Sequence, residues 1–145
     1  MSKLIKFRNA DPNEYPEIEQ LFKAQGLENH KSGVAILKEF VVEKGDQLVG
    51  GAEIILQDEE YTFSVAVDDD FKMSGIGTSL FQMISKEIRN LGAERIMIQA
   101  KVPDYWSKFG FVEIDDPKNA PKTFRCDGCP QYGIDCFPII MTLSL

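Results

Sequence analysis

Phe63 to Leu91 of this 145-residue chain read FSVAVDDDFKMSGIGTSLFQMISKEIRNL, and the spacing of apolar residues changes within this segment. The apolar run Val65 to Val67 follows Tyr61-Thr62-Phe63 and is typical of a buried strand. Three aspartates end the run. Beyond them, apolar residues recur every three or four positions, as on one face of a helix, and they are Ile76, Leu80, Ile84, Ile88 and Leu91. Gly92 then favours a helix stop. The segment therefore predicts a strand, a tight turn and a helix.

The turn between the predicted strand and helix, Lys72 to Thr78, is suited to binding an anion. The first N–H groups of a helix have no intrahelical partner and lie at the positive end of its dipole. Glycines at 75 and 77 have no Cβ, so a diphosphate can approach the backbone, and Lys72 adds a cation. The alternative is that both glycines only relieve crowding where the helix leaves the sheet. Both interpretations stay open on this motif alone.

The spacing of the glycines excludes two common nucleotide-binding motifs. A dinucleotide-binding turn requires a third glycine where Leu80 stands, and no Gly-Lys-Ser/Thr run of a nucleoside-triphosphate loop is present. Lys72-Met73-Ser74-Gly75-Ile76-Gly77 instead resembles the [Gln/Arg]-x-x-Gly-x-[Gly/Ala] signature of the GNAT superfamily of N-acetyltransferases, with Lys replacing Gln or Arg. Tyr105-Trp106-Ser107-Lys108-Phe109-Gly110-Phe111 resembles a second segment of that family, Phe-Tyr-x-x-x-Gly-Phe. The two motifs occur in the family's order, and the resemblance extends over essentially the whole chain.

Length and composition predict one domain, residues 1–145, with a sizeable core. The formal net charge of −7 argues against a non-specific nucleic-acid binder, which needs clustered Lys and Arg. Net acidity either steers a cationic amine substrate or serves solubility alone. The segment Met1 to Lys6 lacks the apolar core of a signal peptide, and no apolar stretch approaches membrane-spanning length. A cytoplasmic protein without a membrane partner is expected.

The predicted fold class is α/β (α+β): a mixed, mostly antiparallel central sheet of about seven strands with helices on both faces. This agrees with the acyl-CoA N-acyltransferase architecture that the resemblance implies. A helix is expected from Asp11 as N-cap, or from Tyr15-Pro16, to Gly26, and a short one from Pro103 to Phe109, with Leu27 to Val34 as a loop or short helix. The expected strands are Leu4–Arg8, Phe40–Glu43, Leu48–Leu56, Tyr61–Val67, Glu94–Ala100, Phe111–Ile114 and Pro138–Leu145.

The resemblance implies an acetyl-CoA site where the fourth and fifth strands splay apart. In the family, the pantetheine arm inserts between these strands and hydrogen-bonds the main chain of the fourth, a role that falls here to Val65, Ala66 and Val67. The pyrophosphate would lie on the backbone of the turn, formed by Lys72, Met73, Ser74, Gly75, Ile76, Gly77 and Thr78.

Acetyl transfer to an amine often needs an acid for the leaving thiolate. The tyrosine that supplies it in the family aligns with Trp106, whose indole N–H is not a realistic proton donor to sulfur. Tyr105 is adjacent, but on a helix it points about 100° away. Three alternatives follow: Tyr105 is the catalytic acid, solvent protonates the thiolate, or the protein is not a conventional catalyst. Packing roles for both aromatic residues stay open.

The transfer also needs a base for the ammonium form of the acceptor. By family analogy Glu53 in the third strand, and Glu59 or Glu60 before the fourth, are candidates, because burial raises a carboxyl pKa. Glu53 is the catalytic candidate retained with Tyr105. His30, the only histidine, lies in a loop that flanks the acceptor site in the family. Solvated side chains are the alternative for each of these residues.

The three cysteines, Cys126, Cys129 and Cys136, follow Cys-x-x-Cys-x6-Cys spacing. Two thiolates so placed can share a zinc ion, with His30, Asp127 or Asp135 as a fourth ligand. A redox role and three unrelated thiols are the other two interpretations.

The sequence therefore predicts an acetyl-CoA-dependent N-acetyltransferase that acts on a primary amine by direct transfer, and a homodimer is a candidate assembly because dimers are common in the family. One alternative is a non-catalytic acyl-CoA sensor, motivated by Trp106. Another is a metal-stabilised interaction domain built on the cysteines. The identity of the amine acceptor does not follow from the sequence, because the loops that select it vary freely on a fixed scaffold.

Overall fold

The computed structural model describes residues 5–24, 34–71, 75–100, 102–116, 120–121 and 139–145. Its helices are the 3-10 turns η1 (Pro12–Glu14) and η2 (Asp69–Phe71) and the α-helices α1 (Tyr15–Ala24), α2 (Ile76–Asn90) and α3 (Pro103–Ser107). Its strands are β1 (Ile5–Asn9), β2 (Val34–Lys44), β3 (Gln47–Gln57), β4 (Glu60–Val67), β5 (Arg95–Ala100), β6 (Val112–Glu113) and β7 (Ile139–Ser144). Within these ranges no helix has the length and apolarity needed to span a membrane.

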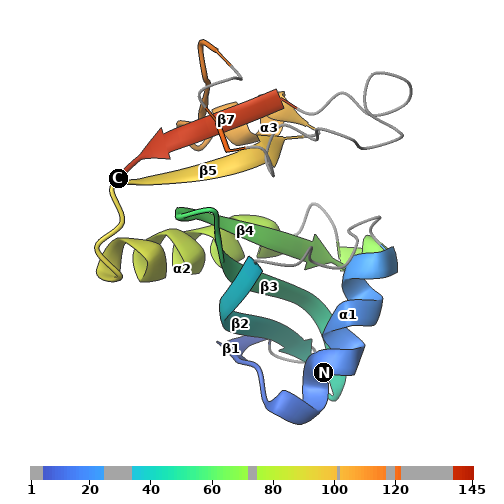
Figure 1. The fold of residues 1–145 in the computed structure, drawn as a ribbon. Coiled ribbons are helices and arrows are strands. Elements are labelled where there is room, and N and C mark those ends of the chain that lie inside the picture. Colours follow the sequence, from blue (N-terminus) through green and yellow to red (C-terminus); the bar gives the residue numbers. More distant parts are fainter. Residues whose placement is uncertain (1–4, 25–33, 72–74, 101, 117–119, 122–138) are drawn as a thin grey trace.

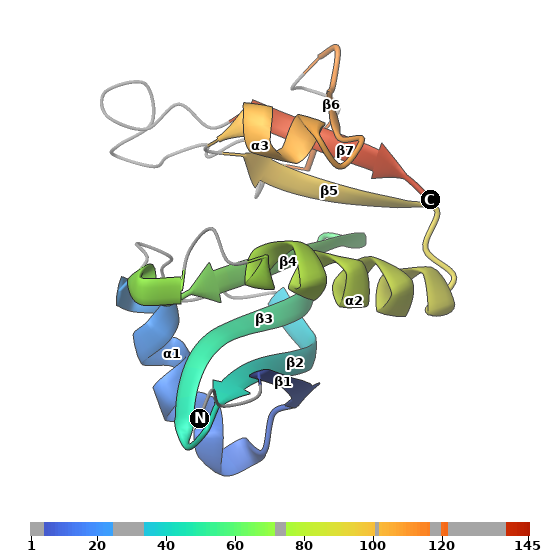
Figure 2. The same cartoon turned by 180° about the vertical axis from the view of Figure 1, so that it is seen from behind.

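The strands form two antiparallel sheets, ordered β1-β2-β3-β4 and β5-β7-β6. β4 and β5 are neighbours and point in the same direction, because α2 crosses between them (Figures 1 and 2). No ladder joins the two strands among the described residues. The predicted mixed α+β class with seven strands is confirmed, and the interruption between the fourth and fifth strands is the splay that the family resemblance implied.

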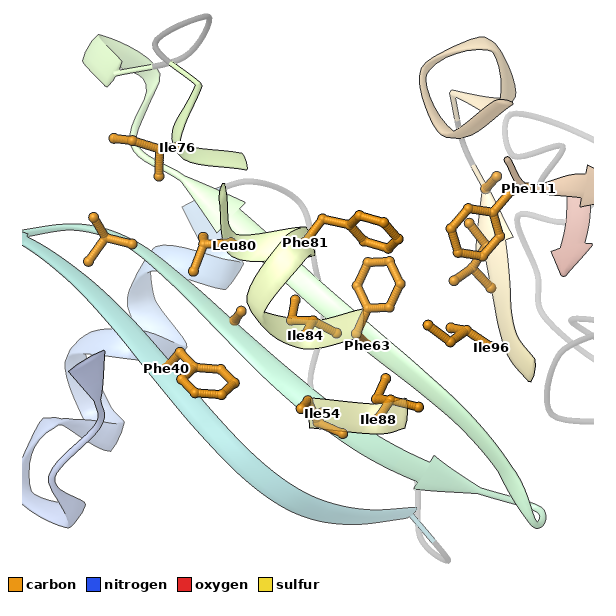
Figure 3. Packing of buried hydrophobic residues seen from close by; sticks show 14 of the residues in the cluster. Phe40, Ile54, Phe63, Ile76, Leu80, Phe81, Ile84, Ile88, Ile96 and Phe111 are labelled. Carbon is orange, nitrogen blue, oxygen red and sulfur yellow. The ribbon is translucent and has the colours of Figure 1, made fainter. Parts of the chain in front are cut away.

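Two helices cover opposite faces of the four-stranded sheet. α1 lies in front of it in Figure 1 and α2 lies behind it, and the order is reversed in Figure 2. The pleat of the strands assigns side chains to these faces alternately. The α2 face receives four of the five residues predicted for the apolar ridge, and Figure 3 shows these side chains directed at the sheet. The fifth, Leu91, follows the end of the helix and is 47% exposed. The ridge and its partners are Ile76, Leu80, Ile84, Ile88, Phe40, Val42, Ala52, Ile54 and Phe63.

The α1 face has a smaller apolar cluster. Ile18 and Phe22 of α1 pack on Val41 and Ala66, and Leu21 is half-buried beside them. The predicted helix start is also confirmed. Asp11 and Glu14 form a capping box over η1, and α1 follows from Tyr15.

Arg8 fixes the corner between β1 and α1. Its guanidinium donates two hydrogen bonds of 2.7 Å to the carboxylate of Glu14 and one of 3.3 Å to Glu43. The hydrogen bonds from Arg8 lower the pKa of Glu14 to about 2, because they favour the ionised carboxylate.

Aromatic residues join the two sheets. The ring of Phe63 on β4 lies 5.2 Å from that of Trp106 on α3 and 6.3 Å from that of Phe111 beside β6. Phe81 on α2 stacks against the same residues and lies 4.7 Å from Phe109. In Figure 3, Phe63 from β4 and Phe81 from α2 lie together and point towards Phe111. Tilted and edge-on ring pairs of this kind add to the burial energy, so α3 is held against α2 and β4.

The start of β2 differs from the prediction. The strand begins at Val34 rather than at Phe40. The sequence predicts Val34 as the last residue of a loop or short helix that starts at Leu27. An irregularity in the pairing with β3 between Ile36 and Lys38 leaves Leu37 without a partner in the register. Ile36 and Leu37 are both exposed, at 44% and 43%, so the apolar alternation that signals a strand is lost there.

Candidate active site

The N-terminus of α2 is built to expose its backbone. Gly75 is the N-cap, with φ of 88°, and none of the described side chains caps the helix there. The first helical hydrogen bond runs from the N–H of Ser79 to the carbonyl of Gly75, so the N–H groups of Ile76, Gly77 and Thr78 precede the ladder. The side chain of Ile76 is buried. Lys72, Met73 and Ser74, assigned to the same turn, lie outside the described residues.

Glycine at two positions lets this helix start lie close to its neighbours. A Cβ on Gly50 of β3 would lie 3.3 Å from Cγ2 of Ile76, so the start of α2 rests directly on β3. A Cβ on Gly77 would lie 3.2 Å from the hydroxyl oxygen of Tyr105. The phenol of Tyr105 thus reaches the first turn of α2.

Tyr105 and Trp106 point to different surroundings. Trp106 is half-buried and belongs to the aromatic cluster, with the rings of Phe63 and Phe111 within 5.9 Å of its own. Tyr105 keeps 36% of its surface exposed. Its ring meets Trp106 edge-on, and its hydroxyl reaches Gly77. Of the two aromatic residues, only Tyr105 therefore presents an O–H at the start of α2.

One edge of β4 faces β5 without a ladder. The other edge pairs with β3 along its whole length, from Glu60 opposite Gln57 to Val67 opposite Gly50. Val65, Ala66 and Val67 lie at the end of β4 nearest the start of α2. These three residues therefore lie near the uncapped start of α2, on a strand whose edge towards β5 has no ladder in the described structure.

Glu59 and Glu60 lie at the opposite end of β4. Asp58 and Glu59 form the turn between β3 and β4, with φ of 49° and 68°. The carboxylate of Glu60 accepts hydrogen bonds from Arg95 at the start of β5, which ties the beginnings of the two strands together. At about 3.3 Å per residue, Glu60 is about 23 Å and Glu59 about 26 Å from Val67. This position does not bring them to the helix start.

Glu53 lies in the middle of β3, between Glu39 of β2 and Ser64 of β4 in the pairing register. It is 6% exposed, and it shares the α1 face with Gly51 because Ala52 and Ile54 point to the α2 face. Its carboxyl lies on the same face as that of Glu39, and burial, then the charge of Glu53 and a side-chain hydrogen bond with it, raise the pKa of Glu39 to about 7. Sequence reasoning missed Glu39. The only signal for Glu39 was its pairing with Glu53 between β2 and β3. A strand predicted to start at Phe40 does not include Glu39.

The remaining candidates lie outside the described residues: His30, Cys126, Cys129 and Cys136, with the alternative ligands Asp127 and Asp135. Within the described ranges no three His, Cys, Asp or Glu side chains are grouped so as to hold a metal ion.

Residues 19–122 match the model of the acetyltransferase (GNAT) domain, which is more than half of the chain. The chain belongs to the GNAT family of N-acetyltransferases. The predicted family and enzyme class are thereby confirmed. Among curated proteins, no sequence match to the chain was found.

Three solved structures illustrate the fold of this GNAT chain. Rv2747 from Mycobacterium tuberculosis, in complex with CoA, has a TM-score of 0.71 at 19% identity, over 97% of this chain and 99% of that one. N-acetylglutamate synthase from Neisseria gonorrhoeae, with CoA and N-acetyl-glutamate, has a TM-score of 0.74 at 19% identity, over 100% of this chain and 36% of the synthase. The ribosomal-protein-S18-alanine N-acetyltransferase from Escherichia coli has a TM-score of 0.61 at 19% identity, over 97% and 94%.

Proposed function

We propose that this GNAT protein binds acetyl-CoA between β4 and β5 and transfers the acetyl group directly to a primary amine. The observation that carries the proposal is the uncapped start of α2 beside the edge of β4 that has no ladder in the described structure. The first-turn N–H groups of α2 suit a pyrophosphate, since they combine free donors with the positive end of the helix dipole. The main chain of Val65, Ala66 and Val67 suits a pantetheine arm, which would bind as an added strand.

Lys72, Met73 and Ser74 are proposed to complete the pyrophosphate site with Gly75, Ile76, Gly77 and Thr78, as the family motif implies. Rv2747 and the N-acetylglutamate synthase are both described in complex with CoA, which supports this choice of cosubstrate. A single domain over 1–145, a cytoplasmic location and a homodimer stay predictions, as does zinc binding by the cysteines.

The transfer has simple proton requirements. The acceptor reaches the site as an ammonium ion and must lose a proton before its nitrogen attacks the thioester carbonyl. The C–N bond forms, the C–S bond breaks, and the second proton of the nitrogen goes to the departing thiolate. Glu53 is the proposed proton acceptor for the ammonium, because it is a buried acid on the α1 face of the sheet. Tyr105 is the proposed acid, because its hydroxyl lies at the helix start where the cosubstrate is expected.

The acceptor is proposed to be a primary amine of an amino acid or of a protein N-terminus. Two of the structural neighbours are an N-acetylglutamate synthase, described in complex with N-acetyl-glutamate, and a ribosomal-protein-S18-alanine N-acetyltransferase, and their names support this choice. L-Glutamate and a peptide with N-terminal alanine are therefore the first acceptors to assay.

The first test is calorimetric titration of acetyl-CoA into the parent, Gly75→Asp and Gly92→Asp. Gly75 and Gly92 begin and end the same helix region, with φ of 88° and 86°, and a Cβ on either would meet nothing within 4 Å. The two variants therefore carry the same backbone strain, but only the first places a carboxylate at the proposed pyrophosphate site. We expect Gly75→Asp to weaken binding about 100-fold or more through repulsion and lost access, and Gly92→Asp to bind like the parent.

Equal binding by both variants would exclude the start of α2 as the pyrophosphate site. A parent that binds acetyl-CoA but acetylates neither of the two amines nor any member of a wider amine panel would favour the sensor alternative. A parent that does not bind acetyl-CoA would favour the metal-stabilised interaction domain, which metal analysis of the purified protein then tests.

A further inference from the structure

Glu39 is a second acid beside the proposed base, and the role inferred for it rests on the proposed function. Glu39 on β2 and Glu53 on β3 are directly opposite in the antiparallel pairing. Cross-strand partners project to the same face, and their Cβ atoms are about 5 Å apart. The face is that of α1, because Phe40 and Ala52, one residue along each strand, pack on the α2 side.

The surroundings of Glu39 oppose its ionisation. Oε2 of Glu39 is buried and has no hydrogen-bond partner among the described atoms. The influences on its carboxyl are burial, the charge of Glu53, a hydrogen bond with Glu53 and the charge of Glu19 from α1, and all four raise its pKa. A hydrogen bond between two carboxyl groups requires a proton on one of them, since two carboxylates have only acceptors.

Among the described residues of β1 and β2, the cations that flank Glu39 are engaged elsewhere. Arg8 of β1 donates to Glu14 and Glu43. Lys38 lies on the α2 side, 3.2 Å from Glu87. From β4, the residues facing the pair are Thr62, Ser64 and Ala66, none of which carries a charge.

We propose that Glu39 is a positioning residue that shares one proton with Glu53, so that the pair rather than Glu53 alone accepts the proton of the amine acceptor. Two interacting carboxyls lose their protons in steps that belong to the pair. At low pH the pair holds the shared proton and attracts the ammonium without deprotonating it efficiently. When the pair loses that proton, it becomes a base whose strength matches neutral pH.

The proton balance closes with this pair. The doubly ionised pair takes one proton from R–NH3+ and returns to its singly protonated form. The neutral amine then attacks the thioester, and its second proton leaves with the thiolate to give CoA–SH. The pair releases its proton to solvent before the next turnover, so each acetyl transfer liberates one proton in total.

The deciding experiment is a 13C NMR titration of the glutamate side-chain carboxyls between pH 4 and pH 9. It compares the intact parent with Glu39→Gln, Glu53→Gln and the control Glu17→Gln, which removes an exposed acid of α1. We expect one carboxyl of the parent to titrate near pH 7, where the Glu39 pKa lies. This titration should vanish in Glu39→Gln, move to lower pH by about one unit or more in Glu53→Gln, and persist in Glu17→Gln. Absence of any carboxyl titration above about pH 6, or its survival in Glu39→Gln, would overturn the pair.

The kinetic arm measures kcat/KM against pH with whichever of L-glutamate and the alanyl peptide is acetylated. The acidic limb of the parent's kcat/KM profile should move down by about one pH unit or more in Glu39→Gln. Glu53→Gln should lose about 100-fold at every pH. A limb that does not move in Glu39→Gln would overturn its role, even if the pair titrates as expected. The proposed function fails separately, through absent acetyl-CoA binding in the calorimetric test.

Discussion

The two faces of the β1-β2-β3-β4 sheet are covered by helices of similar amphipathic character but differ in what they bury. The α2 face buries an apolar ridge against large apolar side chains of three strands. The α1 face has a small apolar cluster of four buried residues. The two buried polar residues of the described structure, Glu53 and Thr62, both lie on it.

This division separates stability from chemistry. Burying apolar area stabilises the fold, whereas burying a carboxyl costs free energy and is retained where function requires it. The α2 face therefore holds the helix whose start binds the proposed cosubstrate, and the α1 face holds the acids proposed to handle the acceptor's proton. Truncation of the α2 ridge should therefore change mainly stability, whereas removal of an acid on the α1 face should change how the protein responds to pH.

The largest expected effect is that of Ile84→Ala on the α2 face. Ile84 is fully buried, so truncation removes apolar contacts and leaves a cavity. We expect the free energy of unfolding to fall by about 3 kcal/mol in urea denaturation. Leu91→Ala is the control, since Leu91 follows the same helix and is 47% exposed, and it should cost less than about 1 kcal/mol. Similar losses for the two variants would contradict the α2 ridge as the main source of stability.

The α2 face was predictable from the sequence and most of the α1 chemistry was not. The spacing of Ile76, Leu80, Ile84 and Ile88 predicts by itself that they share one face of the helix, without any knowledge of the sheet. The contact of Glu39 with Glu53 depends on the register of the two strands, which shifts between Val42 and Glu43, on the hairpin side of the pair. Residue spacing in one strand carries no information on that register.

The second prediction concerns pH, and uses Glu39→Gln against Glu14→Gln. The folded chain raises the pKa of Glu39 from its ordinary 4.5 to about 7, so between these values the native state binds more protons than the unfolded state. Stability therefore falls as pH rises from about 4.5 to 7. Glu39→Gln removes this fall, and we expect it to be more stable than the parent by about 1 to 2 kcal/mol at pH 8, a value reduced for solvent screening.

Glu14 gives the opposite sign. Its pKa is lowered from 4.5 to about 2, so its pairing with Arg8 stabilises the fold above about pH 4.5, and this contribution is lost as pH falls towards 2. Glu14→Gln should destabilise the protein at pH 8 by about 1 kcal/mol. Denaturant unfolding at pH 5 and pH 8 measures both variants. If both are destabilised equally at pH 8, the carboxyls at 39 and 53 do not repel each other in the folded chain.

The aromatic motif shows a further limit of sequence reasoning. Helical geometry alone predicted that Tyr105 and Trp106 point in different directions. Which of them enters the core depended on Phe63 and Phe81, which come from β4 and α2 and approach only in the folded chain. The contact of the Tyr105 hydroxyl with Gly77 was likewise not predictable, because nothing in a glycine motif says whether the space it leaves serves a ligand or another side chain.

The smallest expected effect compares Gly50→Ala with Gly51→Ala, which place the same methyl group on opposite faces of β3. On the α2 face, the new Cβ at position 50 would lie 3.3 Å from Cγ2 of both Ile76 and Val42. On the α1 face, the Cβ at position 51 would make ordinary contacts, at 3.5 Å from the carbonyl of Phe40 and 3.7 Å from Cγ2 of Ile18. Gly51→Ala should keep the parent's stability or gain about 0.5 kcal/mol, because alanine restricts the unfolded chain.

Gly50→Ala should lose about 1 kcal/mol through overpacking and, because Ile76 must shift with the start of α2, bind acetyl-CoA a few-fold more weakly. Urea denaturation and calorimetric titration of both variants make the comparison. If only Gly51→Ala bound acetyl-CoA more weakly, the residues that determine acetyl-CoA binding would lie on the α1 face. This result would contradict the proposed role of the helix start. Loss of stability in Gly50→Ala with unchanged binding would show instead that Ile76 yields to the methyl group without moving the backbone of the turn.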